Sequence, residues 1–275
     1  ASDVYKRQQQ VPVALSCAPL PAEQKAMVVT VLDMSEVRHL HQQLEFQAVT
    51  DPLTGLLNRR GFHQAVENIL LRSERNEQSL VLLYLDLDGF KRVNDSLGHD
   101  AGDRVLRWVS EQMQACLRSC DILGRMGGDE FTALLELECP EQAAKISEKL
   151  IERVSVCQQV DGLEVMLGVS IGIATFPDCG SDLSGLLRAA DIAMYEAKRA
   201  GRQQYRYYDQ EMNGRARSRL MLEDSVRTAI HNKDFTLVYQ PQVSLEDGRL
   251  RGVEALLRWQ HPSVGDVPPG LFLPL

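Results

Sequence analysis

The chain has 275 residues, of which 44% are hydrophobic and 25% are charged, as in ordinary globular proteins. A net charge of −8 gives no general reason to expect binding to nucleic acid or to an anionic membrane. The sequence contains no apolar run near the ~20 residues of a membrane helix and no visible signal peptide. Its six cysteines form no Cys-x-x-Cys pair, which favours a reducing cytoplasm, with any membrane attachment through regions outside this fragment.

Both ends of the sequence indicate a fragment. The chain begins with Ala1 rather than Met and stops at Leu275 in the middle of a pattern. Within residues 1–34, the β-branched run at 27–34 predicts a strand. A strand that ends in an acid and leads into a helix resembles the end of a PAS sensor domain. The alternative is a simple strand that packs on the next domain.

A helix is predicted over residues 35–49. Val37, Leu40 and Leu44 follow coiled-coil spacing, and Gln47 breaks the next core position. This helix is interpreted either as a signalling helix that pairs two subunits or as a linker helix with one packed face.

The next region, residues 50–210, alternates strands and helices. Asn58 is the expected N-cap of a helix, and a buried strand follows from residue 80. Further helices are expected in 105–117, 141–156 and 183–200, with a hairpin around residues 122–135 and strands in 163–176. This β-α-β-β-α-β order predicts an α+β fold with helices packed on a mainly antiparallel sheet.

Acidic residues cluster at two strand ends. Asp86 and Asp88 share one face of the first strand because side chains alternate along a strand. About forty residues later, Gly127 and Gly128 predict a tight turn that places Asp129 and Glu130 at the start of the second hairpin strand. A calcium loop is excluded, since Phe90 and Leu97 stand where an EF-hand needs oxygen ligands. Carboxylates from two strands suit Mg²⁺ with substrate phosphates, whereas the alternative is solvated turn residues.

The arrangement resembles the GGDEF family of diguanylate cyclases. Six sequence blocks carry the resemblance in the family's order, at residues 51–60, 86–95, 98–103, 127–131, 170–174 and 189–202. It implies a ferredoxin-like palm fold, as in nucleotidyl cyclases. It also implies that Asp86, the carbonyl of Leu87, Asp129 and Glu130 hold Mg²⁺ (or Mn²⁺), with Glu130 alternatively acting as the base.

The resemblance assigns the substrate and product sites as well. Lys91, Lys198 and Arg202 would bind the triphosphate of GTP, Gly127 and Gly128 would approach its phosphates, and Asn94 and Asp103 would read guanine. Lys198 and Arg202 are four residues apart at a helix end, so we expect both to face one anion. Arg118 and Asp121 resemble the family's inhibitory site for the product, cyclic di-GMP.

Residues 211–275 are predicted to form a linker helix and the truncated start of an EAL phosphodiesterase domain. Gln240, Glu254 and Arg258 lie in its two strand-like segments, and Glu254 and Arg258 have side chains suited to metal and phosphate. The family's β/α barrel needs roughly 250 residues, so an incomplete barrel without phosphodiesterase activity is expected.

The function predicted from the sequence is the condensation of two GTP molecules into cyclic di-GMP and pyrophosphate, with feedback inhibition by the product. Because each subunit would hold one GTP, a homodimer is expected. The alternative is a non-catalytic module that binds GTP or cyclic di-GMP and regulates an attached phosphodiesterase.

Overall fold

The computed structural model describes residues 13–19, 27–76, 80–156, 158–160, 162–263 and 265–273. The chain divides into two compact units, Ala1–Tyr207 and Tyr208–Leu275. Predictions for residues 1–12 and 20–26, which belong to the expected sensor-domain end, lie outside the described residues. Across the described ranges, no helix is both long and apolar enough to cross a membrane.

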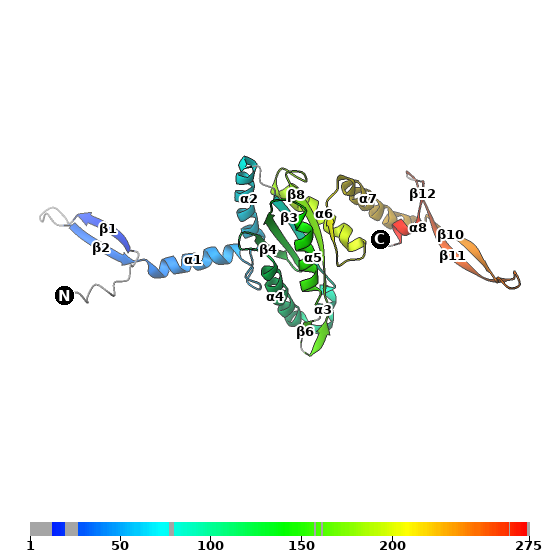
Figure 1. Cartoon of the computed structure of the whole chain (residues 1–275), viewed down its shortest axis with the longest axis horizontal. Helices are drawn as coiled ribbons and strands as arrows, with labels where there is room; N and C mark the ends of the chain where they lie inside the picture. Colours follow the sequence, from blue (N-terminus) through cyan, green and yellow to red (C-terminus); the bar gives the residue numbers. More distant parts are fainter. Residues whose placement is uncertain are drawn as a thin grey trace. The chain divides into compact units, whose positions relative to one another are not determined.

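The first unit contains most of the helices and strands (Figure 1). Its helices are α1 (Ser35–Val49), α2 (Arg59–Asn76), α3 (Phe90–Leu97), α4 (His99–Cys116), α5 (Gln142–Val154) and α6 (Leu183–Arg199). Its strands are β1 (Val13–Pro19), β2 (Met27–Asp33), β3 (Leu80–Asp88), β4 (Ile122–Gly127), β5 (Glu130–Glu136), β6 (Gln158–Val160), β7 (Leu163–Val165), β8 (Gly168–Phe176) and β9 (Tyr205–Tyr207).

A five-stranded sheet in the order β4-β5-β3-β8-β9 forms the centre of this unit. Every neighbouring pair is antiparallel except β8 and β9, which are parallel. The predicted α+β architecture is therefore confirmed. Three strands of this unit were not predicted: β1, which pairs with β2 in a separate hairpin, β6, which pairs with β7, and the short edge strand β9.

Strand β3 lies in the middle of the sheet, and its alternating side chains divide the unit into two layers. Its odd-numbered residues, Val81 to Leu87, join the main hydrophobic core together with residues of α4 and α5. Its even-numbered residues face the other layer, where α6 packs on β3 and β8. Gly172 of β8 permits this close packing, since an added Cβ would lie 1.8 Å from the Ala190 carbonyl oxygen of α6.

Helix α1 has the predicted bounds and is joined firmly to the segment that follows it. The Asn58 side chain donates hydrogen bonds to the carbonyl oxygens of Ala48 and Thr50. It also accepts from the Gly61 amide at 2.9 Å, which confirms Asn58 as the N-terminal cap of α2. Val37 and Leu40 are more than half exposed on α1. Pairing of two subunits through this helix stays a prediction.

The second unit consists of α7 (Gln210–Asn232), β10 (Phe235–Val243), β11 (Leu250–His261), β12 (Gly265–Val267) and α8 (Pro269–Phe272). The three strands form an antiparallel sheet in the order β10-β11-β12. Its small core gathers around Trp259, which contacts the rings of Phe235 and Phe272.

The predicted phosphodiesterase-like residues lie on the hairpin formed by β10 and β11. Gln240 and Glu254 are direct cross-strand partners, and both are exposed. Arg258 is half-buried and donates to the neighbouring Leu257 carbonyl oxygen. Glu254 and Arg258 share a face of β11, because they are an even number of residues apart.

Candidate active site at two strand ends

The predicted acidic cluster assembles on the α6 side of the sheet. Asp86 lies on the central strand β3, directly between Glu130 of β5 and Ser170 of β8. Asp88 follows on the same face and is paired with Gly168 of β8. The alternation predicted from sequence therefore holds, and it places two carboxylates against a helix rather than in solvent.

The glycine turn carries one correction to the sequence prediction. Gly127 pairs with Glu130, so Gly128 and Asp129 form the turn and Asp129 is not the first strand residue. A register shift between Arg125 and Gly127 moves the turn by one residue. Gly127 and Gly128 have φ values of +139° and +54°, a region that favours glycine. Asp129 consequently lies at the tip, beside β3, where its carbonyl oxygen accepts from the Leu87 amide.

An arginine clamp holds this turn in place. Arg125 donates through Nε and Nη2 to the Gly128 carbonyl oxygen at 3.0 and 2.7 Å, and through Nη1 to Asp51. Asp51 also accepts from the amide and hydroxyl of Thr54. Burial opposes ionisation of Asp51, but the Thr54 hydrogen bonds and the Arg125 guanidinium outweigh it and hold its pKa below the usual range. The segment after α1 is thereby connected to the glycine turn.

Asp86 is a buried carboxylate whose partner is a lysine of α6. The Nζ atom of Lys198 lies 2.6 Å from Asp86 Oδ1, and the Asp86 side chain is only 10% exposed. Burial raises the pKa of Asp86 to about 6; Asp129 and Asp88 act in the same direction, and Lys198 opposes them. An added positive charge near Asp86 would therefore stabilise its ionised form.

Glu130 is held by a tyrosine that the sequence reasoning missed. The Tyr84 hydroxyl, on the same face of β3, donates to Glu130 Oε2 at 3.0 Å. Burial and then Glu130 raise the pKa of Tyr84, so the phenol remains a donor. Asp191 of α6 belongs to the same cluster, where partial burial and Glu130 raise its pKa and Lys198 opposes them. Tyr84 lies two residues before Asp86 on β3, so the same side-chain alternation could have placed it beside the acids.

The residues expected to read a base lie on the α3–α4 pair. Lys91 is exposed in the first turn of α3, while Asn94 and Asp103 are half-buried on α3 and α4. A Cβ added to Gly102 would lie 2.0 Å from Asn94 Oδ1. The small residue on α4 therefore makes room for the Asn94 amide beside Asp103.

Arg202 lies outside the helix in which it was predicted. Helix α6 ends at Arg199, and Arg202 follows in a turn with a φ of +62°. Its Nε atom lies 3.9 Å from Asp88 Oδ1, whereas Lys198 reaches Asp86. Gly201 ends the helix early because glycine readily adopts its positive φ of +124°. Each cation is thus paired with its own carboxylate at the strand end.

The side chains at this strand end supply only some of the ligands that a divalent cation needs. Among the described residues, no group of three or more His, Cys, Asp or Glu side chains converges to hold a metal alone. Asp86 and Asp129 nevertheless supply hard oxygen donors, and burial, followed by the charges of Asp129 and Asp88, raises the pKa of Asp86. A hard cation that keeps positions for substrate phosphates suits two carboxylates better than a complete protein cage.

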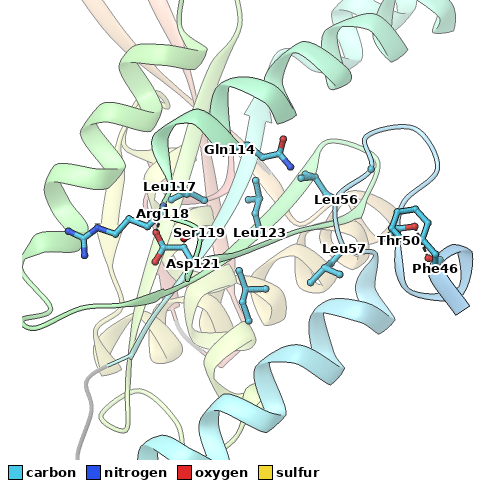
Figure 2. Close-up of a pocket in the computed structure, with 12 residues that line it drawn as sticks. Phe46, Thr50, Leu56, Leu57, Gln114, Leu117, Arg118, Ser119, Asp121 and Leu123 are labelled. Carbon is cyan, nitrogen blue, oxygen red and sulfur yellow. Dashed lines mark hydrogen bonds between the residues drawn. The ribbon is translucent and has the colours of Figure 1, made fainter. Parts of the chain in front are cut away.

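Arg118 and Asp121 form a tight turn between α4 and β4. The Asp121 carboxylate accepts from the Arg118 amide at 2.7 Å, and its other oxygen is buried and has no hydrogen-bond partner among the described residues. Both residues border a cavity of about 590 Å³ that also reaches Phe46 of α1 and Leu123 of β4. Figure 2 shows the Arg118 guanidinium directed away from the leucines of this cavity. The structure thus brings the two residues together at an open edge.

A test of the cluster follows from the pKa of Asp86. Its raised pKa means that the folded protein retains this proton more strongly than the unfolded chain does, so the free energy of unfolding should fall as pH rises from about 4 to about 6. Asp86→Asn mimics the protonated acid and should remove that loss, on the order of 2 kcal/mol. Urea unfolding without divalent cations, at several pH values, measures it. Glu152→Gln, an exposed change on α5, is the control, and parallel curves for parent and Asp86→Asn would contradict the assignment.

Comparisons with known proteins agree with this geometry. Residues 48–204 match the family described as diguanylate cyclase, GGDEF domain, and residues 223–275 match the EAL domain. The bifunctional diguanylate cyclase/cyclic di-GMP phosphodiesterase MucR of Pseudomonas aeruginosa is 39% identical, over 91% of this chain and 38% of its own length. The cyclic di-GMP phosphodiesterase NbdA of the same organism is 35% identical, over 88% of this chain and 31% of its own length. The chain thus spans about a third of these relatives.

Solved structures share the fold of the first unit. The GGDEF domain of TpbB (YfiN) from Pseudomonas aeruginosa has a TM-score of 0.59 at 35% identity, covering 61% of this chain and 99% of that one. The coiled coil and GGDEF domain of DgcB from Caulobacter crescentus, in complex with c-di-GMP, has a TM-score of 0.58 at 28% identity, covering 62% and 92%. The family match extends over more than half of the chain and includes both acidic strand ends. The chain therefore belongs to the GGDEF domain family.

Proposed function

We propose that residues 50–210 form a diguanylate cyclase domain, which condenses two GTP molecules into cyclic di-GMP and releases pyrophosphate. The observation that carries the proposal is the meeting of Asp86, Asp129 and Glu130 with Lys198 at the end of the central strand. Two further cations, Lys91 and Arg202, lie on the adjoining α3 and on the turn after α6. Such a cluster suits a substrate that brings both phosphates and a divalent cation.

In this proposal, Asp86, Asp129 and the Leu87 carbonyl would hold Mg²⁺ or Mn²⁺, and Glu130 would be either a further ligand or the base. When bound, the metal would supply positive charge that neutralises the phosphate oxygens. Lys198 and Arg202 bind the triphosphate. To do so, Lys198 would exchange its contact with Asp86 for one with a phosphate, and a bound cation would supply the positive charge that Asp86 then lacks.

The protein's own groups also account for the group transfer. In each of two reciprocal steps, the 3′-hydroxyl oxygen of one GTP attacks the α-phosphorus of the other, and the bond from that phosphorus to the β-phosphate breaks. Two pyrophosphates leave, and the second step closes the ring. As the base, Glu130 takes the hydroxyl proton, while Tyr84 fixes one of its two oxygens. Gly127 and Gly128 carry no side chains, so the turn admits phosphate oxygens close to its backbone. Asn94 and Asp103 offer an amide and a carboxylate to the guanine edge.

Two subunits are needed, because each would hold a single GTP and the product joins two. Exposed Val37 and Leu40 on α1 support a homodimer in which α1 brings two cyclase domains face to face. The free cysteines 116, 120, 139 and 179 fit a cytoplasmic protein. The second candidate function is a non-catalytic GTP- or cyclic di-GMP-binding module that regulates an attached phosphodiesterase. This second candidate is supported by the relative NbdA, which is named as a cyclic di-GMP phosphodiesterase and not as a cyclase.

Product feedback is part of the proposal. Arg118 is exposed and free to meet a phosphate or a purine, and Asp121 can accept from a base edge. The complex of DgcB with c-di-GMP supports a product site in this family's domain. Product bound there and on a second domain would hold two GTP sites apart.

The first experiment tests catalysis. Purified protein is incubated with GTP and Mg²⁺, and the products are analysed by mass. Asp129→Asn removes a charge at the turn with little change in volume, so product formation should fall by about a hundredfold or more while the fold is retained. Glu111→Gln, an exposed acid on α4, should keep the parental rate. A dimeric Asp129→Asn protein with undiminished turnover would contradict the proposed metal site.

The second expectation concerns hydrolysis. Gln240, Glu254 and Arg258 lie on an antiparallel hairpin in a unit of three strands, and no closed barrel surrounds them within the described residues. We therefore expect the 275-residue chain not to convert cyclic di-GMP into the linear dinucleotide. Chromatography after prolonged incubation with Mg²⁺ or Mn²⁺ tests this, and hydrolysis that scales with protein through purification would refute it.

The third experiment tests feedback. Arg118→Ala should weaken cyclic di-GMP binding by about tenfold, because a charge-assisted contact to phosphate is lost. Inhibition should be non-competitive with GTP in the parent and relieved in the variant. Calorimetric titration and progress curves measure both effects, with Arg107→Ala, an exposed arginine on α4, as the control. Equal binding and equal slowing in parent and Arg118→Ala would place the inhibitory site elsewhere.

A further inference from the structure

The turn that carries Arg202 has an unusual backbone. Gly201, Arg202 and Gln203 have φ values of +124°, +62° and +47° in succession. Only glycine adopts this region freely, so two consecutive side-chain-bearing residues there are unfavourable without support. The turn also connects α6 to the edge strand β9. Something in the surrounding structure must hold it.

Asp88 supplies that support. Its side chain is 7% exposed and accepts from the Ser170 hydroxyl, with both oxygens at 2.9 Å. Its Oδ2 atom also accepts from the Gln203 amide at 3.1 Å, and Arg202 Nε lies 3.9 Å from Oδ1. One buried carboxylate thus binds the backbone of the turn and lies next to the cation that the turn carries.

The other side of the turn is fixed to α6. The Arg202 amide and the Gln204 side chain both donate to the Ala197 carbonyl oxygen, at 3.2 and 3.1 Å. Asp88 therefore closes a bridge from the central strand to the end of the helix. Both of its oxygens are engaged in this bridge. By contrast, among the described residues Asp86 has its close contact with the Lys198 nitrogen.

Space for the bridge is provided by the cross-strand partner of Asp88. A Cβ added to Gly168 would lie 2.4 Å from Gln203 Cγ and 3.1 Å from Asp88 Oδ2. The Gln203 side chain thus lies directly over this glycine. At Gly168, therefore, the turn after α6 packs closely against the backbone of β8 and the carboxylate of Asp88.

We propose that Asp88 is a positioning residue for the triphosphate of GTP. It holds residues 201–203 in the left-handed conformation that presents Arg202, and so it sets GTP affinity rather than the rate of the chemical step. This inference rests on the proposed function, in which Arg202 binds the triphosphate. A carboxylate that only stabilised the fold would have no selective effect on GTP binding through Arg202.

The test is a double-mutant cycle between Asp88→Asn and Arg202→Ala in the full chain. Binding of a non-hydrolysable GTP analogue with Mg²⁺ is measured by calorimetry, and KM and kcat are measured with GTP. Asp88→Asn should raise the Kd and KM about tenfold, since a charged acceptor for the turn is lost, and should change kcat by less than about threefold. In the Arg202→Ala background, the same change should add less than about twofold.

Ser170→Ala is a milder second variant in case Asp88→Asn fails to fold. It removes only the hydroxyl that orients Asp88, and it should raise KM about threefold in the parent and not in the Arg202→Ala background. Thermal unfolding of each variant checks the fold. The inference would be overturned if the effects of the Asp88 or Ser170 change and of Arg202→Ala on Kd and KM were fully additive. A fall in kcat at constant KM would also overturn it. A parent that neither binds the analogue nor turns over GTP would overturn the proposed function itself.

Discussion

Burial of carboxylates at the end of the central strand is the constraint on which the rest of this site depends. Asp86 lies between two antiparallel neighbours, Asp88 is paired with β8 alone, and both side chains are at most 10% exposed, so water solvates them poorly. A buried carboxylate is tolerated only with a partner. Lys198 forms an ion pair with Asp86. The Gln203 amide and the Ser170 hydroxyl donate hydrogen bonds to Asp88. The two acids therefore determine how the end of α6 and the turn after it are placed.

The two acids differ in how completely they are satisfied, and this difference divides their roles. Asp88 makes short hydrogen bonds from several directions, as a fixed structural support does. Within the described residues, the close partner of Asp86 is the Lys198 ammonium group, and its pKa is raised by burial and then by Asp129 and Asp88. In the proposed enzyme, Asp86 is therefore the acid that would hold a metal ion, and Asp88 is the acid that positions the turn.

A second chain of contacts reaches the same site from the α1 side. Asn58 binds the end of α1, and Asp51 and Arg125 connect the following segment to the Gly128 carbonyl oxygen. The cavity beside Arg118 lies next to this segment and includes Phe46 and Leu57. In the proposed enzyme, the helix that pairs subunits, the product site and the catalytic turn thus share one small region of packed structure.

The sequence by itself determined the α+β architecture, the bounds of α1 and the shared face of Asp86 and Asp88. These follow from local rules, because apolar periodicity and side-chain alternation depend only on neighbouring residues. The resemblance to the GGDEF family, later shown by the family match, rested on sequence blocks alone. Roles inferred from that resemblance remain proposals.

Only the tertiary structure decided the partners of those residues. It moved Asp129 into the turn, placed Arg202 beyond the helix, and paired Tyr84 with Glu130 and Asp88 with Gln203. Asp88 and Gln203 are 115 residues apart in sequence. Such contacts arise from strand register and from the point at which a helix stops. Both depend on long-range packing, which no local pattern in the sequence specifies.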